Sequence, residues 1–267
     1  MAEPAVIVEK DGPVLIVTLN RPEKRNAVNA EVMCRLTDAW IQLDEEDDLR
    51  CLILTGNGPV FCAGMDLSVI GKMGSDEPGD EYMERVRKDP AIIYHSWLKT
   101  YRPTKPVILA VEGYALAGGT EILQGTDIRV AGESAQFGVT EVQRGLFPMA
   151  GSTVRLPRQI PYTVALEMLL TGEAISAQRA LELGLIGHVV PDGQALAKAK
   201  EIANRIAENG PLAVKGILAT IRETAMLPEE EAWGPEQKHG MAVFASEDSR
   251  EGPRAFLEKR EPVFKGK

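Results

Sequence analysis

Residues 107–123 read VILAVEGYALAGGTEIL, an apolar run followed by small residues and then by the start of a helix. Val107–Val111 is short and continuously apolar, which is typical of a strand buried on both faces. The small residues of Gly113–Gly119 allow the backbone to turn tightly and to approach other groups closely. Because parallel strands buried in this way need helices on their faces, this stretch predicts an α/β fold.

The rest of the chain divides into a strand-rich first part and a helix-rich second part. After about residue 155, strand patterns almost disappear and helical periods dominate. The polar segment Gly71–Glu81 is expected to be a mobile loop. The expected elements are a β-hairpin of Ala5–Val8 and Val14–Leu19, a helix at Asn29–Leu43, strands at Cys51–Leu54, Val107–Val111, Ile128–Ala131 and Ile186–Val190, and later helices at Tyr162–Leu170, Ala177–Leu183, Leu196–Ala207, Leu212–Ala225, Glu230–Ala245 and Pro253–Lys259.

Charge and composition limit the expected partners. The chain has 267 residues and a formal net charge of -9. Phosphate backbones and anionic membrane surfaces attract basic faces, so neither nucleic acid nor a membrane is the expected partner. A small anionic ligand held by a few local cations is still compatible with this charge. Because we recognise no targeting segment and no apolar window long enough to span a bilayer, we expect a cytoplasmic protein.

The cysteines and histidines predict no metal site. Cys34, Cys51 and Cys62 are odd in number and widely spaced, which fits buried thiols in a reducing compartment. A reactive role for Cys62 is the less favoured alternative. No His/Cys cluster has metal-ligand spacing. The glycine-rich motifs of ATP, GTP and dinucleotide sites are also absent from the sequence.

Two turns of small residues, Phe61–Leu67 and Gly113–Glu121, each follow a buried strand and precede an apparent helix. Backbone N–H groups in such turns approach a ligand closely, and a helix N-terminus adds partial positive charge. Two such groups that converge on one oxygen would form an oxyanion hole. The alternative is that the glycines serve only tight turns and close packing, and the pattern alone slightly favours this alternative.

Two glutamates, Glu121 and Glu141, lie among small and apolar residues. Burial raises the pKa of a carboxyl group, and two such groups can divide proton transfer between a general base and a general acid. Considered singly, Glu121 is more simply explained as a helix-capping acid and Glu141 as an acid of a surface turn.

Five motifs follow one another along nearly the whole chain: LNRPEKRNAVN (19–29), FCAGMDL (61–67), EGYALAGGTEIL (112–123), AQFGVTEVQRGLFPMAGSTVRL (135–156) and EGPRAFLEKREPVF (251–264). In this order they resemble the enoyl-CoA hydratase/isomerase, or crotonase, family. The segment Ala177–Val190 also resembles a recurring part of the family. The resemblance implies a crotonase-like core of spiral ββα turns in residues 1–195 and a helical oligomerisation region in residues 196–267. It further implies a homotrimer or a dimer of trimers.

The resemblance also implies roles for individual residues. The backbone N–H groups of Met65 and Gly118 would bind the thioester carbonyl of an acyl-CoA, while Glu121 and Glu141 would hold a water molecule between them. The motif positions implied to contact this substrate are Arg21, Lys24, Arg25, Ala27, Ala63, Asp66, Leu67, Lys259 and Phe264. The segment expected to border the acyl chain contains Leu67, Ile70, Met73, Tyr82, Ile92 and Trp97, for which simple packing is an equally open interpretation.

The presence of both acids favours an enoyl-CoA hydratase among the activities of the family. The implied reaction is the reversible syn addition of water to a trans-2-enoyl-CoA, as in fatty acid β-oxidation, with no metal or redox cofactor because CoA is part of the substrate. The alternatives are a double-bond isomerase, which commonly lacks the acid matching Glu121, another acyl-CoA lyase, or a non-catalytic CoA-binding protein. Thr140, where proline is usual, and Met149–Ser152, where a more glycine-rich stretch is usual, depart from the family pattern.

Overall fold

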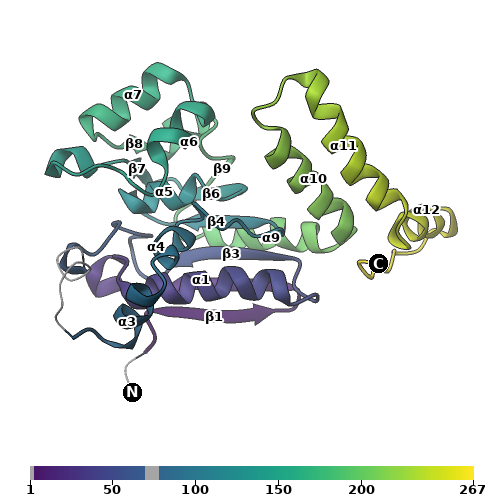
Figure 1. The fold of residues 1–267 in the computed structure, drawn as a ribbon, viewed down its shortest axis with the longest axis horizontal. Coiled ribbons are helices and arrows are strands. Elements are labelled where there is room, and N and C mark those ends of the chain that lie inside the picture. The colour runs from purple at the N-terminus through teal and green to yellow at the C-terminus, as the bar shows by residue number, and fades with distance from the viewer. Residues whose placement is uncertain (1–2, 70–77) are drawn as a thin grey trace.

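A computed structural model describes residues 3–69 and 78–267 (Figure 1). Most of the segment predicted to be a mobile loop, Gly71–Glu81, lies outside these residues, and a helix begins at its last residue. No helix within the described residues is long and apolar enough to cross a membrane.

A six-stranded sheet forms the centre of the fold, with the strand order β1-β2-β3-β4-β6-β9. The first two strands form the predicted antiparallel hairpin, which turns through Gly12 with a φ of 57°. The remaining neighbours pair in parallel, as the continuous apolar runs predicted. The strands are β1 (Val6–Asp11), β2 (Val14–Leu19), β3 (Cys51–Gly56), β4 (Val107–Val111), β6 (Ile128–Gly132) and β9 (His188–Val190).

Each face of this sheet is covered by a helix (Figure 1). On β3, Leu52 and Leu54 belong to the core that includes α1 (Ala30–Glu45), whereas Cys51 and Ile53 belong to the core that includes α9 (Ala195–Ala207). This division follows from the alternation of side chains along a strand. The buried stripe of α9 is alanine at every fourth position, namely Ala195, Ala199 and Ala203, so this helix can lie close to the sheet.

A second, three-stranded sheet contains β5 (Tyr114–Leu116), β7 (Gln136–Gly138) and β8 (Ile175–Ser176). β5 follows β4 directly and leads into α5 (Gly118–Leu123), while β7 follows β6 and leads into the short 3-10 helix η2 (Glu141–Arg144). These are two successive ββα turns of the implied spiral core. Because β5 pairs in parallel with β7, the segments that carry the two glutamates emerge at the same edge.

The helices predicted for the second half are all present, although the last one begins earlier than expected. They are α7 (Tyr162–Thr171), α8 (Ala177–Glu182), α9, α10 (Pro211–Thr224), α11 (Glu229–Phe244) and α12 (Asp248–Glu258). The sequence patterns missed α3 (Glu81–Lys88), α4 (Ala91–Ser96), α6 (Ser152–Gln159) and the whole second sheet. These elements are short, with only two or three residues in each strand of the second sheet, so they hold too little of a period to be recognised.

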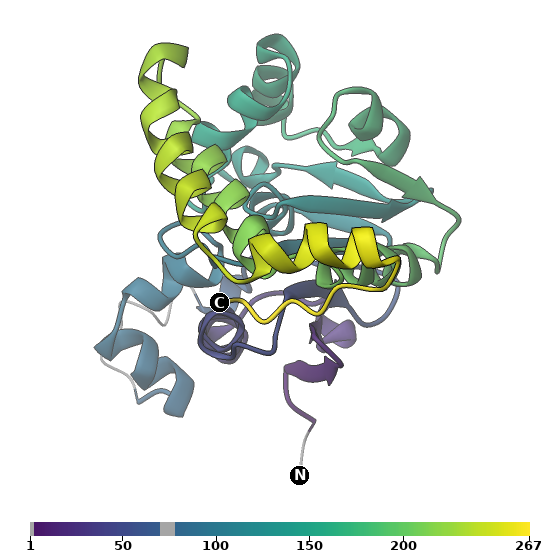
Figure 2. The same ribbon diagram turned by 90° about the vertical axis from the view of Figure 1, so that its right-hand side faces the viewer.

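The last three helices extend away from the sheet (Figure 1). α12 and the C-terminal residues lie side by side (Figure 2), and the Asp248 carboxylate accepts hydrogen bonds from the Lys265 and Gly266 N–H groups. α9 packs against the sheet through its buried alanines. The predicted boundary at residue 195 instead assigns residues 196–207 of this helix to the helical C-terminal region. The domain boundary itself stays a prediction.

Gly113 lies in the turn between β4 and β5, and a substitution there tests how closely the backbone is packed where the two sheets meet. A Cβ at this position would lie 1.9 Å from the Pro59 carbonyl oxygen, and φ is +62°. We expect Gly113→Ala to lower the free energy of unfolding by about 3 kcal/mol or more, because left-handed strain and overpacking add. Gly12→Ala is the matched control, since its φ is +57° but nothing lies within 4 Å. Urea denaturation should show a loss of only about 1 kcal/mol for this control, and equal losses in both variants would contradict the packing argument.

Candidate active site

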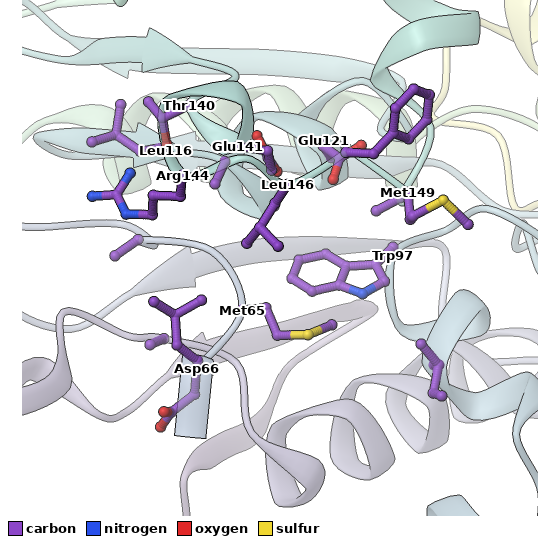
Figure 3. A pocket seen from close by; sticks show the side chains of 18 of the residues that line it. Met65, Asp66, Trp97, Leu116, Glu121, Thr140, Glu141, Arg144, Leu146 and Met149 are labelled. Carbon is purple, nitrogen blue, oxygen red and sulfur yellow. The ribbon is translucent and has the colours of Figure 1, made fainter. Parts of the chain in front are cut away.

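A cavity of about 750 Å³ opens beside the edge where β5 and β7 end. Its walls come from segments far apart in the sequence (Figure 3). It is lined by Lys24, Arg25, Ala27, Ala63, Met65, Asp66, Leu67, Ile93, Tyr94, Trp97, Leu116, Ala117, Gly118, Glu121, Thr140, Glu141, Arg144, Leu146, Phe147, Met149 and Ala150. The structure therefore brings together ten of the residues singled out in the sequence as site residues: Lys24, Arg25, Ala27, Ala63, Met65, Asp66, Leu67, Gly118, Glu121 and Glu141.

The two small-residue turns converge at this cavity. The Cys62 N–H donates to the Tyr114 carbonyl at 3.1 Å, and the Leu116 N–H donates to the Cys62 carbonyl at 2.9 Å. Gly64, with a φ of +94°, lies so close to the second turn that a Cβ would be 3.0 Å from the Gly118 nitrogen. Neither the Met65 nor the Gly118 N–H has an acceptor among the described residues. Both amides are thus available to a ligand oxygen, as the predicted oxyanion hole requires.

The backbone that presents the Gly118 amide is held in an unusual conformation. Ala117 has a φ of 51° and a ψ of -123°, which is rare for a residue with a Cβ. Its N–H donates to the Gly138 carbonyl at 2.8 Å. The ring of Trp97 covers Gly118 so closely that a Cβ there would lie 2.6 Å from the indole Cη2. Glycine is therefore required at position 118, and the helix start is held from both sides.

Glu121 is buried, with 3% of its surface exposed, but it has polar partners. The Ser152 N–H donates to its Oε1 at 3.0 Å, and the Ala150 and Gly151 N–H groups also favour the carboxylate. Burial nevertheless raises the pKa of Glu121 above its ordinary value. The simpler interpretation, that Glu121 caps its own helix α5, is not supported, because its carboxylate accepts a hydrogen bond from Ser152 at the start of α6.

Glu141 faces the same cavity as Glu121 (Figure 3). Burial, and then the negative charge of Glu121, raise the pKa of Glu141 to about 7. Its Oε2 is buried and has no hydrogen-bond partner among the described residues. A paired arrangement of this kind lets one carboxyl group hold a proton while the other stays ionised at neutral pH. Such a pair can give and accept protons on one bound molecule.

The loop at one side of the cavity contains the predicted CoA-contacting cations. Lys24 and Arg25 line the cavity, but Arg21 does not. The Arg21 guanidinium forms a salt bridge with Asp66 at 3.1 Å and donates to the Ala27 carbonyl. Arg21 thus joins this loop to the turn that carries Met65, and its geometry does not support the implied substrate contact.

Other predicted substrate contacts lie elsewhere in the chain. Lys259 ends α12, and Phe264 lies beside that helix, so neither lines the cavity within one chain. Tyr82 accepts a hydrogen bond from Arg35, and Ile92 is buried in the main core, so the packing interpretation is correct for both. Leu67 and Trp97 do line the cavity, while Ile70 and Met73 lie outside the described residues.

Several residues of the cavity were not singled out from the sequence. Arg144, Leu146 and Phe147 come from the motif that contains Glu141, and Ile93 and Tyr94 come from the unpredicted helix α4. Arg144 follows Glu141 by three residues on η2, and this helical spacing was the available signal.

The three cysteines of the chain are buried thiols, and one of them, Cys62, lies in the turn that leads to Met65. Cys34, Cys51 and Cys62 are free and buried, as predicted. Burial raises the pKa of Cys62 to about 12, which does not favour a reactive role for this thiol. Among the described residues, no three His, Cys, Asp or Glu side chains lie close enough together to hold a metal ion.

Comparisons with known proteins agree with the fold. The family model described as "Enoyl-CoA hydratase/isomerase" matches residues 9–267. The chain is 55% identical over 264 residues to enoyl-CoA hydratase EchA19 of Mycobacterium tuberculosis, covering 99% of this chain and 97% of that protein. It is 34% identical to carnitinyl-CoA dehydratases of Salmonella strains, over 97% of both chains.

Solved structures give the same result. A crystal structure of an enoyl-CoA hydratase from Mycobacterium tuberculosis matches with a TM-score of 0.89 and 41% identity, covering 99% of this chain and 100% of that chain. An enoyl-CoA hydratase from Bacillus anthracis matches with a TM-score of 0.89 and 37% identity, covering 98% of this chain and 100% of that one.

The raised pKa of Glu141 predicts a pH-dependent stability of the free protein. A carboxyl group whose pKa rises on folding, here from 4.5 to about 7, binds its proton more tightly in the folded state. Stability is therefore lost as the pH rises through this interval. Glutamine cannot ionise, so we expect Glu141→Gln to avoid this loss. From pH 5 to pH 8, the free energy of unfolding of the variant should rise relative to that of the wild type by on the order of 2 kcal/mol.

The measurement is the free energy of unfolding in urea at both pH values. Glu167→Gln, on the exposed surface of α7, is the control and should follow the wild type. If the free energy of unfolding depends on pH in the same way in the wild type and in Glu141→Gln, the pKa of Glu141 does not rise on folding.

Proposed function

Because this chain belongs to the enoyl-CoA hydratase/isomerase family, we propose that it catalyses the reversible syn addition of water to a trans-2-enoyl-CoA, giving a 3-hydroxyacyl-CoA. The observation that carries this proposal is the meeting of four groups in one cavity. Glu121 and Glu141 supply two carboxyl groups of raised pKa, and Met65 and Gly118 supply two unpaired N–H groups.

The two amides would bind the thioester carbonyl oxygen. Addition of water at Cβ moves negative charge onto this oxygen, so hydrogen bonds to it strengthen as the enolate forms. One donor of this kind contributes roughly 3–4 kcal/mol in comparable sites. The strained backbone at Ala117 and the cover of Trp97 keep the Gly118 donor in place before the substrate arrives.

The two acids would hold the attacking water and divide the proton transfers. Three backbone N–H groups favour the ionised form of Glu121, which suits it to accept a proton from the water. Burial, and then the negative charge of Glu121, raise the pKa of Glu141 to about 7, which suits it to deliver a proton to Cα. These groups complete the reaction without a metal or redox cofactor, and CoA enters only as part of the substrate.

The wider setting follows from the same proposal. Large apolar side chains are exposed on the C-terminal helices, among them Ile217, Trp233 and Phe244. Burial of such a surface between copies of the chain would stabilise an oligomer, which supports the implied homotrimer or dimer of trimers. A place in fatty acid β-oxidation and a cytoplasmic location fit an acyl-CoA substrate.

A second candidate is the removal of water from a different hydroxyacyl-CoA. The relatives at 34% identity are named carnitinyl-CoA dehydratases, and dehydration uses the same acid–base pair in the reverse direction. A panel of enoyl-CoA and 3-hydroxyacyl-CoA thioesters, with carnitinyl-CoA included, distinguishes the two. Hydration is followed by the loss of absorbance of the conjugated thioester, and inactivity on every enoyl-CoA would refute the first proposal.

Removal of either acid should abolish most turnover. We expect Glu121→Gln and Glu141→Gln each to reduce kcat by at least ~100-fold, because each loses one proton transfer of the reaction. Glu167→Gln again provides a control on the exposed surface. A near-normal rate in either variant, measured on the best enoyl-CoA of the panel, would contradict the two-acid mechanism.

A further inference from the structure

Arg144 lines the cavity but has no part in the proposed chemistry. It ends η2, three residues after Glu141. Figure 3 shows its guanidinium group directed away from the pair formed by Glu121 and Glu141, on the side of Thr140 and Leu116. Its position in the wall of the cavity therefore needs a separate explanation.

The guanidinium group of Arg144 has no hydrogen-bond or ion-pair partner among the described residues. Two other arginines near the site differ in this respect. Arg21 is paired with Asp66, and Arg155 donates to the carbonyl groups of Trp97 and Leu98. Arg144 is solvent-exposed and lines the cavity without an ion-pair partner among the described residues. It is available to an anion that enters the cavity.

Arg144 and Asp66 lie away from the large apolar side chains of Trp97 and Met149 in the cavity. In the view of Figure 3, Arg144 and Asp66 lie towards one end, and Trp97 and Met149 lie towards the other. The loop with Lys24 and Arg25 is joined to Asp66 through Arg21, so the cationic side chains share the first end. Ile93 and Tyr94 of α4 adjoin Trp97 in the sequence and extend the apolar wall.

Met65 and Asp66 form one side of the cavity, and Glu141 and Arg144 form the other (Figure 3). Lys24 and Arg25 belong to the first side, because the Ala63 N–H donates to the Arg25 carbonyl at 3.0 Å. Neither Lys24 nor Arg25 forms a salt bridge with a described residue. Three cations that form no salt bridge with a described residue thus line the cavity, with Lys24 and Arg25 on one side and Arg144 on the other.

We propose that Arg144 binds a phosphate group of the CoA moiety, across the cavity from Lys24 and Arg25. The inference rests on the proposed function only in taking a CoA thioester as the ligand. Guanidinium groups bind phosphate oxygens through paired hydrogen bonds, which a lone lysine cannot match. This contact sets the direction of the substrate: the nucleotide part passes Arg144, and the acyl group extends towards Trp97.

Arg144 also acts on Glu141, and the test must separate the two effects. The positive charge of Arg144 lowers the pKa of Glu141, against the larger effects of burial and of Glu121. A change at Arg144 could therefore alter catalysis through Glu141 alone. Such an effect would be the same for every thioester, whereas loss of a phosphate contact affects only ligands that carry phosphate.

The experiment measures binding of free coenzyme A by calorimetry to the wild type, Arg144→Gln, Arg144→Lys and Arg158→Gln. Arg158 is the control, because it is exposed on α6 and does not line the cavity. We expect Arg144→Gln to weaken CoA binding about tenfold, as for one charge-assisted contact. Arg144→Lys should recover part of this loss, and Arg158→Gln should bind as the wild type does.

A kinetic comparison completes the test. With a butenoyl thioester of CoA, Arg144→Gln should raise KM about tenfold, while with the phosphate-free pantetheine thioester KM should not change. Equal effects on both thioesters, or unchanged CoA affinity in Arg144→Gln, would overturn the inference. If the wild type binds CoA but hydrates no enoyl-CoA, the proposed function fails while the calorimetric result still decides the role of Arg144. If the wild type does not bind CoA, both are refuted.

Discussion

In the second sheet Leu116 of β5 pairs in parallel with Gly138 of β7, and the Ala117 N–H donates to the Gly138 carbonyl at 2.8 Å. The Thr120 hydroxyl, which is buried, accepts from the Gly138 N–H at 3.0 Å and donates to the Ala115 carbonyl. The remaining site geometry depends on this pairing. It places the start of α5, with its free amide and Glu121, beside the segment that carries Glu141, and the turn Phe61–Leu67 then pairs with β5 from its other side.

The raised pKa values of Glu121 and Glu141 follow from the position of both carboxyl groups in one partly buried cavity. Burial alone would keep both protonated, and two charges close together would repel. The N–H groups at residues 150–152 favour the charged form of Glu121, against the burial that raises its pKa, whereas burial and then the charge of Glu121 raise the pKa of Glu141 to about 7. The two carboxyl groups therefore differ in their hydrogen-bond partners, and the N–H groups that favour the charge on Glu121 come from the start of one short helix, α6.

The charge of the whole chain and the charge of the cavity are different quantities. A net charge of -9 argues against long polyanions, yet Lys24, Arg25 and Arg144 line the cavity. Screening at physiological salt limits the reach of distant charges to roughly 8 Å, so a charged group in the cavity would interact mainly with the charges that line it. The apolar side chains at the opposite end, including Trp97 and Met149, complement an acyl group in the same way.

The sequence by itself determined the alternation of strands and helices, the helical second half, the two turns and both acids. Each of these depends on neighbouring residues or on a motif, so local periodicity and resemblance are sufficient. Only the tertiary structure decided that Arg21 forms a salt bridge with Asp66 and that Arg144 lines the cavity. It also decided that Tyr82 and Ile92 pack against the main core. These outcomes depend on partners tens of residues away, and a charged or apolar side chain has the same local pattern whether it meets a ligand or another part of the chain.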